Sequence, residues 1–206
     1  MMENLIAFIW ASILIELTPG PNMAFLALIS ATKGRRFGFA TSAGVALGLL
    51  TIGLLAAAGV GAIVAQNPVL FQLLRWGGIA YLLYLAWEGW REAGESSPQK
   101  ADTTSSDLTY FRHGLTVNLL NPKAALFYIT ILPTFLSSRG ADWTEIYSLT
   151  AIYVGIATAV HVLIVIFAGS FHQFLDDPKR SLWLRRVLAL ALALTAIWFG
   201  WSTRPG

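Results

Sequence analysis

The sequence predicts an all-α integral membrane protein with six transmembrane helices, arranged as two inverted three-helix repeats whose first and fourth helices are broken. Three observations predict this fold: the composition, six long apolar stretches, and helix-breaking residues inside two of them. Of the 206 residues, 56% are hydrophobic and 12% are charged, and the mean hydropathy is +0.63. A soluble domain carries about 25% charged residues, so this chain has too few charges to cover a water-facing surface.

Six stretches are apolar and long enough to cross a bilayer as helices, which takes roughly 20 residues. They are Asn4–Ile29, Phe37–Ala65, Pro68–Trp87, Gly114–Leu136, Ile146–Phe171 and Leu182–Trp201. The last is the weakest, because its uninterrupted apolar part begins only at Val187. The residues before the first stretch lack the positive region of a signal peptide, so we expect that stretch to remain in the mature protein.

The chain is predicted to form one membrane domain over residues 1–206, divided into two halves by a polar segment. Residues 1–91 form the first three-helix repeat, 92–111 a flexible cytoplasmic loop rich in Ser, Thr, Asp, Glu and Gly, and 112–206 the second repeat. An odd number of spans in each half means that the halves enter the membrane from opposite sides.

The basic residues of the connections predict the orientation, because cytoplasmic loops carry an excess of Lys and Arg. The second connection has none and the fourth has only Arg139. The first, third and fifth connections hold Lys33, Arg35, Arg36, Arg91, Lys100, Arg112, Lys179, Arg180, Arg185 and Arg186. These three connections are therefore expected in the cytoplasm, with both termini outside.

A carboxylate and a helix break interrupt the first span. Glu16 stands in the apolar run, and Pro19-Gly20-Pro21-Asn22 follows it. A charge near the bilayer centre costs on the order of 3 kcal/mol or more. Broken backbone at membrane depth is tolerated only inside protein or against a water-filled cavity. This stretch is therefore interpreted as a functional site.

A second break is predicted at Pro122 in the fourth span, with Asn121 as the cap of the helix that restarts there. Asn118 lies one helical turn before Asn121, on the same face. Helix-interrupting prolines at corresponding places in two halves point to the binding site of a transporter. From the predicted boundaries both breaks lie nearer the cytoplasmic side, whereas a strict inverted repeat would mirror their depths.

Together the two breaks offer the charges that hold a zwitterion. A helix that restarts after a break presents free N–H groups and the positive end of its dipole to an anion. Lys123 adds a positive charge and Glu16 a negative one, which is the layout for an amino acid. The predicted substrate-binding residues are Glu16, Pro19, Gly20, Pro21, Asn22, Asn118, Asn121, Pro122 and Lys123.

Several of these residues have a structural alternative. Glu16 and Lys123 could instead neutralise each other as a structural ion pair. Asn118 could instead form a hydrogen bond that holds two helices together. Glu16 and His161 are the candidates for proton coupling, although a lone histidine is more often a packing residue. The small-residue stripe through Gly44 and Gly48 predicts close helix packing within the chain, with a homodimer seam as the alternative.

Several chemistries lack their residues. The chain has no cysteine, no HExxH and no P-loop, so we expect no metal, no cofactor and no ATP-driven step. Although the net charge is +3, no basic tract with interleaved aromatics suggests nucleic acid. The expected partners are a small-molecule substrate and the lipid bilayer.

The motifs resemble those of the LysE/RhtB amino-acid exporters over nearly the whole chain. The matching segments are Leu17-Thr18-Pro19-Gly20-Pro21-Asn22, Lys33-Gly34-Arg35-Arg36, Ala43-Gly44-Val45-Ala46-Leu47-Gly48, Gly77-Gly78-Ile79-Ala80-Tyr81-Leu82-Leu83-Tyr84-Leu85 and Gly114-Leu115-Thr116-Val117-Asn118-Leu119-Leu120-Asn121-Pro122-Lys123-Ala124. The resemblance implies a secondary exporter of amino acids in a bacterial cytoplasmic membrane, working by proton antiport. The resemblance implies that the residues of the two helix breaks bind the substrate. At the position of Glu16 many relatives have an apolar or small residue, so the resemblance implies that Glu16 is a feature of a subgroup.

The predicted function is therefore export of an amino acid or a related zwitterionic metabolite, and the protein is not expected to be an enzyme. One alternative is an intramembrane enzyme in which Glu16 and His161 act as acid and base, which requires both within about 3 Å of a common point. Another is a channel-like membrane subunit, which a continuous polar stripe through the bundle would favour.

Overall fold

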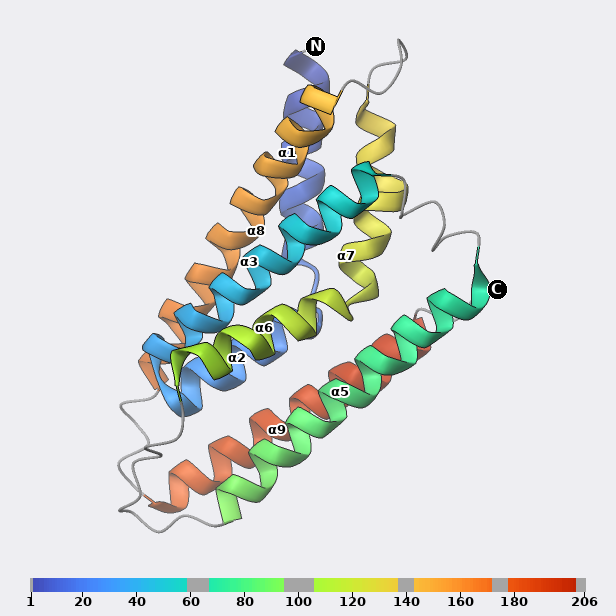
Figure 1. Cartoon of the computed structure of the whole chain (residues 1–206). Coiled ribbons are helices and arrows are strands. Elements are labelled where there is room, and N and C mark those ends of the chain that lie inside the picture. Colours follow the sequence, from blue (N-terminus) through green and yellow to red (C-terminus); the bar gives the residue numbers. More distant parts are fainter. Residues whose placement is uncertain (1, 59–66, 95–105, 137–142, 172–177, 203–206) are drawn as a thin grey trace.

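The computed structural model describes residues 2–58, 67–94, 106–136, 143–171 and 178–202, and regular structure there is helical throughout (Figure 1). The helices are α1 (Met2–Leu17), α2 (Pro21–Lys33), α3 (Arg35–Ala57), α5 (Pro68–Gly94), α6 (Asp107–Leu119), α7 (Pro122–Leu126), the π-helical turn η1 (Phe127–Ile131), the 3-10 turn η2 (Leu132–Phe135), α8 (Trp143–Ser170) and α9 (Pro178–Ser202). The all-α prediction is confirmed for these residues.

The described helices supply up to five membrane spans by length and composition. Three continuous helices, α3, α5 and α8, are each long and apolar enough to cross. Two bent pairs would each cross as one broken span: α1 with α2, bent by 58°, and α6 with the helix after it, bent by 53°. Helix α9 is not among them, so a sixth span remains a prediction.

The predicted loop 92–111 is too long at both ends. Helix α5 continues to Gly94, and α6 already begins at Asp107. The early start has a local cause, because the Ser106 hydroxyl caps the helix by accepting a hydrogen bond from the Thr109 amide at 3.3 Å. Residues 95–105 lie outside the described residues, as do 59–66, 137–142 and 172–177, so the orientation predicted from the connections stays a prediction.

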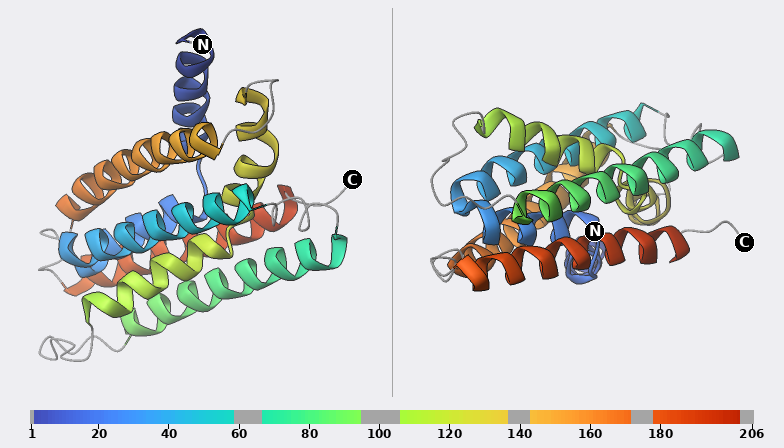
Figure 2. Two further views of the ribbon diagram at one scale, coloured as in Figure 1. Left: turned by 45° about the horizontal axis from the view of Figure 1, so that its top comes forward. Right: turned by 90° about the horizontal axis from the view of Figure 1, so that it is seen from below.

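The helices form layers around the two broken spans. Helices α5 and α9 run along each other on one side of the molecule, with α2 and α6 between this pair and α3 (Figures 1 and 2). Helix α8 packs on α3, α2 and α1 at the opposite side. One apolar core lies where α1, α3, α8 and the segment after Pro122 meet, and a second lies where α2, α5, α6 and α9 meet.

The small-residue stripe of α3 packs within the chain, against α6. A Cβ at Gly44 would overlap the Phe111 carbonyl oxygen, and a Cβ at Gly114 would overlap that of Thr41. A Cβ at Gly48 would lie 2.7 Å from the Asn118 amide nitrogen. Glycine at these positions therefore allows the two helix backbones to touch, which brings Asn118 against α3.

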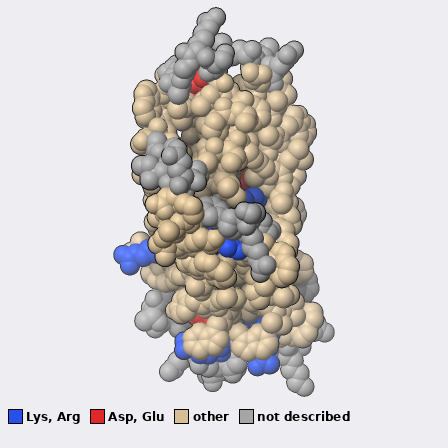
Figure 3. Space-filling view, turned by 90° about the vertical axis from the view of Figure 1, so that its right-hand side faces the viewer, with Lys and Arg blue, Asp and Glu red and all other residues tan. Residues whose placement is uncertain are grey.

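Large apolar side chains cover much of the outer surface. Trp10, Leu14, Leu73, Phe167 and Trp201 are each at least 60% exposed. The face in Figure 3 is mostly uncharged, and Lys and Arg atoms gather toward its lower end. Such a surface suits contact with lipid, since soluble monomers rarely expose large apolar patches.

Candidate functional site

The two helix breaks lie against each other in the middle of the molecule. The Asn22 side-chain amide donates a hydrogen bond to the Asn118 side-chain oxygen at 2.8 Å, and both residues are buried. Helices α2 and α6, which each have 13 residues, run from the breaks toward the same end of the bundle (Figure 1). The two breaks therefore lie at similar distances from that end, while their depth in the membrane stays a prediction.

Local backbone chemistry builds each break. Pro21 occupies the first position of α2 and Pro122 the first position of α7, where a missing N–H costs no helix bond. The predicted cap is also present, since the Asn121 side-chain oxygen accepts a hydrogen bond from the Lys123 amide at 3.0 Å. Two half-helix N-termini thus begin in the interior of the fold.

A small cavity of about 10 Å³ lies between the breaks. This is room for roughly one water molecule. Five of the nine predicted binding residues line it, namely Glu16, Gly20, Asn22, Asn121 and Lys123, together with Met23, Leu49, Ala124 and Tyr153. Pro21 is buried at the start of α2, and Asn118 reaches the site through its bond to Asn22. In this conformation the cavity is closed around a volume too small for an amino acid.

Glu16 finds its partners on α8. Its Oε1 accepts a hydrogen bond from the Tyr153 hydroxyl at 2.7 Å, and its Oε2 lies 3.4 Å from His161 Nε2. Glu16 is 5% exposed and His161 is 0% exposed. A carboxylate, an imidazole and a phenol from two helices therefore meet in the interior, in an arrangement that can hold and transfer a proton.

Lys123 is directed to the first break. Its ammonium donates to the Thr18 carbonyl oxygen at 2.8 Å, at the end of α1. Within the described part of the chain no Glu16–Lys123 ion pair forms, so the structural-pair alternative is not what this conformation shows. Lys123 and Glu16 instead stand on the wall of the same cavity, each held by another partner.

Tyr153 is a site residue that the sequence interpretation missed. It lies eight residues before His161 on α8, which places both on one face of the helix. This spacing could have identified Tyr153 from the sequence, because it places two polar aromatic rings on one buried face of the helix, the face that contacts α1. Two further hydroxyls near this cluster, on Tyr128 and Thr150, are buried without a hydrogen-bond partner.

An apolar groove of about 240 Å³ adjoins the cavity. Thr18 and Lys123 form its polar edge, and Ile15, Pro19, Leu126, Phe127, Ile131 and Trp198 line the rest. Since Lys123 lines both spaces, its bond to Thr18 stands between the closed cavity and the open groove.

Comparison with known proteins finds relatives that match most of the chain. The sequence profile of the LysE type translocator family matches residues 13–203. A leucine efflux protein of Enterobacter sp. (strain 638) is 28% identical over 179 residues, covering 86% of this chain and 85% of that protein. An uncharacterized membrane protein of Vibrio cholerae is 29% identical over 182 residues, covering 84% of this chain and 85% of the relative. No solved structure matches the chain.

Proposed function

The chain belongs to the LysE type translocator family, and from this premise we propose that it exports amino acids through the paired helix breaks. Proteins of this family are transporters, and the chain is a multi-pass membrane protein. The Glu16–His161 separation of 3.4 Å meets the geometric requirement of the enzyme alternative, but a transporter family gives that alternative no support.

The observation that carries the proposal is the charge layout of the small cavity. Glu16 and Lys123, of opposite charge, line it at the point where two half-helix N-termini begin. The substrate carboxylate would bind the Lys123 ammonium and the N–H groups at the start of α2, and its ammonium would bind Glu16. The remaining predicted residues, Pro19, Gly20, Pro21, Asn22, Asn118, Asn121 and Pro122, shape this site.

The proposed substrate is a neutral amino acid with an aliphatic side chain. The groove beside Lys123 is lined mostly by apolar residues, among them Leu126 and Ile131, which suits such a side chain. Two relatives in the comparison are named leucine efflux proteins. Leucine is therefore the first substrate to test.

Transport would proceed by alternating access with proton antiport, across a bacterial cytoplasmic membrane and with both termini outside. Opening the closed cavity toward the groove would separate Lys123 from Thr18. Glu16 would release a proton when the substrate ammonium binds, and His161, 3.4 Å away, would be the neighbouring proton acceptor. Two inverted three-helix repeats that rock against each other would move the breaks together.

Efflux of amino acids from intact cells tests the function directly. Cells are loaded with leucine-containing dipeptides, and the amino acids released are measured with and without the protein. We expect faster leucine release when the protein is present, with smaller effects for charged amino acids. Identical release across a broad amino-acid panel would contradict the proposed substrate class.

Replacing Lys123 tests the carboxylate site. We expect Lys123→Gln to raise the KM for leucine by about tenfold or more, because one charge-assisted hydrogen bond to the substrate is lost. The matched control is Arg112→Gln, which removes an exposed positive charge from α6 away from both spaces. Efflux kinetics in proteoliposomes measure both; an equal KM for Lys123→Gln and the control would refute this role.

A further inference from the structure

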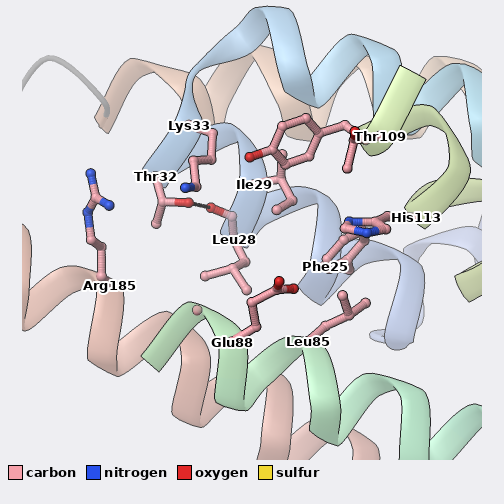
Figure 4. Close-up of a pocket in the computed structure, with 12 residues that line it drawn as sticks. Phe25, Leu28, Ile29, Thr32, Lys33, Leu85, Glu88, Thr109, His113 and Arg185 are labelled. Carbon is pink, nitrogen blue, oxygen red and sulfur yellow. Dashed lines mark hydrogen bonds between the residues drawn. The ribbon is translucent and has the colours of Figure 1, made fainter. Parts of the chain in front are cut away.

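A second and larger cavity lies at the end of the bundle where α2 ends and α6 begins. It has a volume of about 110 Å³ and is lined by residues of α2, α5, α6 and α9. Charged groups stand on its wall: Lys33 from α2, Glu88 from α5 and Arg185 from α9. In Figure 4, Lys33 and Glu88 extend into the cavity from opposite sides, with Arg185 at one end and His113 at the other.

Apolar side chains line the space between these charges. Leu28 and Ile29 of α2 and Leu85 of α5 are each buried and face the cavity (Figure 4). One carboxylate, two cations and an aliphatic wall within one cavity match the chemistry of an amino acid with an apolar side chain. A purely anionic ligand would use only Lys33 and Arg185 and would leave Glu88 facing a like charge, whereas a zwitterion pairs with all three.

We propose that this cavity is a second amino-acid site, an access site that holds the substrate before it reaches the helix breaks. The inference rests on the proposed export function. The ammonium of the substrate binds Glu88, its carboxylate binds Lys33 and Arg185, and its side chain packs on Leu28 and Leu85. Lys33 and Arg185 have protein partners already, so the substrate shares these side chains with them.

The position of the cavity supports a role on the transport route. Helix α2 lines both spaces, with Asn22 and Met23 at the small cavity and Phe25 at the large one. Phe25 is 1% exposed, and its ring centre lies 6.4 Å from that of His113 on α6. Phe25 lies three residues after Asn22 on α2, so a substrate that moves along this helix between the two cavities would pass its ring.

The basic residues around the cavity fit the direction of export. Lys33 and Arg185 belong to connections that the charge distribution predicts to be cytoplasmic. An exporter takes its substrate from that side, so a zwitterion site there raises the local substrate concentration at the entrance.

Substitution of Glu88 tests the access site by transport kinetics in proteoliposomes. We expect Glu88→Gln to raise the KM for leucine by about tenfold, the loss of one charge-assisted contact, while the maximal rate changes by less than about twofold. Arg185→Gln is the second variant, with the same expectation. The control is Asp107→Asn, which removes a carboxylate that pairs with Arg36 outside the cavity. Unchanged KM in both cavity variants, or the same rise in the control, overturns the proposal.

Equilibrium binding of radiolabelled leucine to the purified protein separates this proposal from the export function. We expect Lys123→Gln to bind leucine about tenfold more weakly at the helix breaks and with unchanged affinity at the access site, and the Lys123→Gln/Glu88→Gln double variant to be weakened about tenfold at both sites. If the wild-type protein neither binds nor transports leucine, the export function itself fails. If it does both, and the double variant binds as the single variant does, only the access site is wrong.

Discussion

Glu16→Gln is expected to reduce leucine efflux by about 100-fold or more while the protein stays folded. The amide keeps the size of the side chain and an oxygen that accepts the Tyr153 hydrogen bond. It removes the negative charge that the substrate ammonium and the exchanged proton would share, and losing one partner of a buried charge pair costs about 2–5 kcal/mol, where each 1.4 kcal/mol is a factor of ten. Proteoliposomes with an imposed pH gradient measure the effect.

Tyr153→Phe is the matched control for Glu16, because it removes only the hydrogen bond and leaves the charge. We expect it to lose less than about tenfold in rate, the effect of one neutral donor. Size-exclusion profiles and melting temperatures of both variants report whether the fold is intact. Full, gradient-driven efflux by a folded Glu16→Gln protein would show that this carboxylate has a structural role only.

Gly44→Ala is expected to have the largest effect on stability. The added Cβ would overlap the carbonyl oxygen of Phe111, which belongs to the backbone of α6 and has no rotamer to change. The helices α3 and α6 must then separate, and overpacking of this kind costs typically 1–3 kcal/mol and sometimes more. We expect a fall in melting temperature of roughly 10 °C or loss of the folded protein, on the scale of about 2–4 °C per kcal/mol.

Gly155→Ala provides the control for this prediction. A Cβ at Gly155 in α8 has no atom within 4 Å, so the same substitution adds no contact. Alanine favours a helix over glycine by about 1 kcal/mol, and we expect an unchanged or slightly raised melting temperature. Equal melting temperatures of the Gly44 and Gly155 variants would mean that α3 and α6 do not pack this closely in solution.

The helix breaks were predictable because their causes are local. Pro21 and Pro122 lack an amide hydrogen in any fold of the chain, so each interrupts a helix. Asn121 caps the following helix by accepting a hydrogen bond from the amide two residues further on. The membrane class was predictable for a similar reason, since composition alone limits how much charge can face water. The four-residue spacing of Gly44 and Gly48 likewise predicts a close contact between helices.

The partners of Glu16 were decided only by the tertiary structure. Tyr153 lies 137 residues further along the chain and meets Glu16 because α1 packs on α8. Periodicity indicates which face of a helix is buried, but it does not indicate which helix covers that face. The same reason explains Lys123, whose ammonium bonds to Thr18 rather than to Glu16, and the access cavity, whose charges come from three helices distant in sequence.

The sequence by itself therefore determined the all-helical membrane class, the two breaks and the chemical types present at them, since these depend on backbone chemistry within a few residues. The tertiary structure decided which charges share a cavity, because long-range packing of α1, α7 and α8 sets the distances between side chains that local sequence leaves independent.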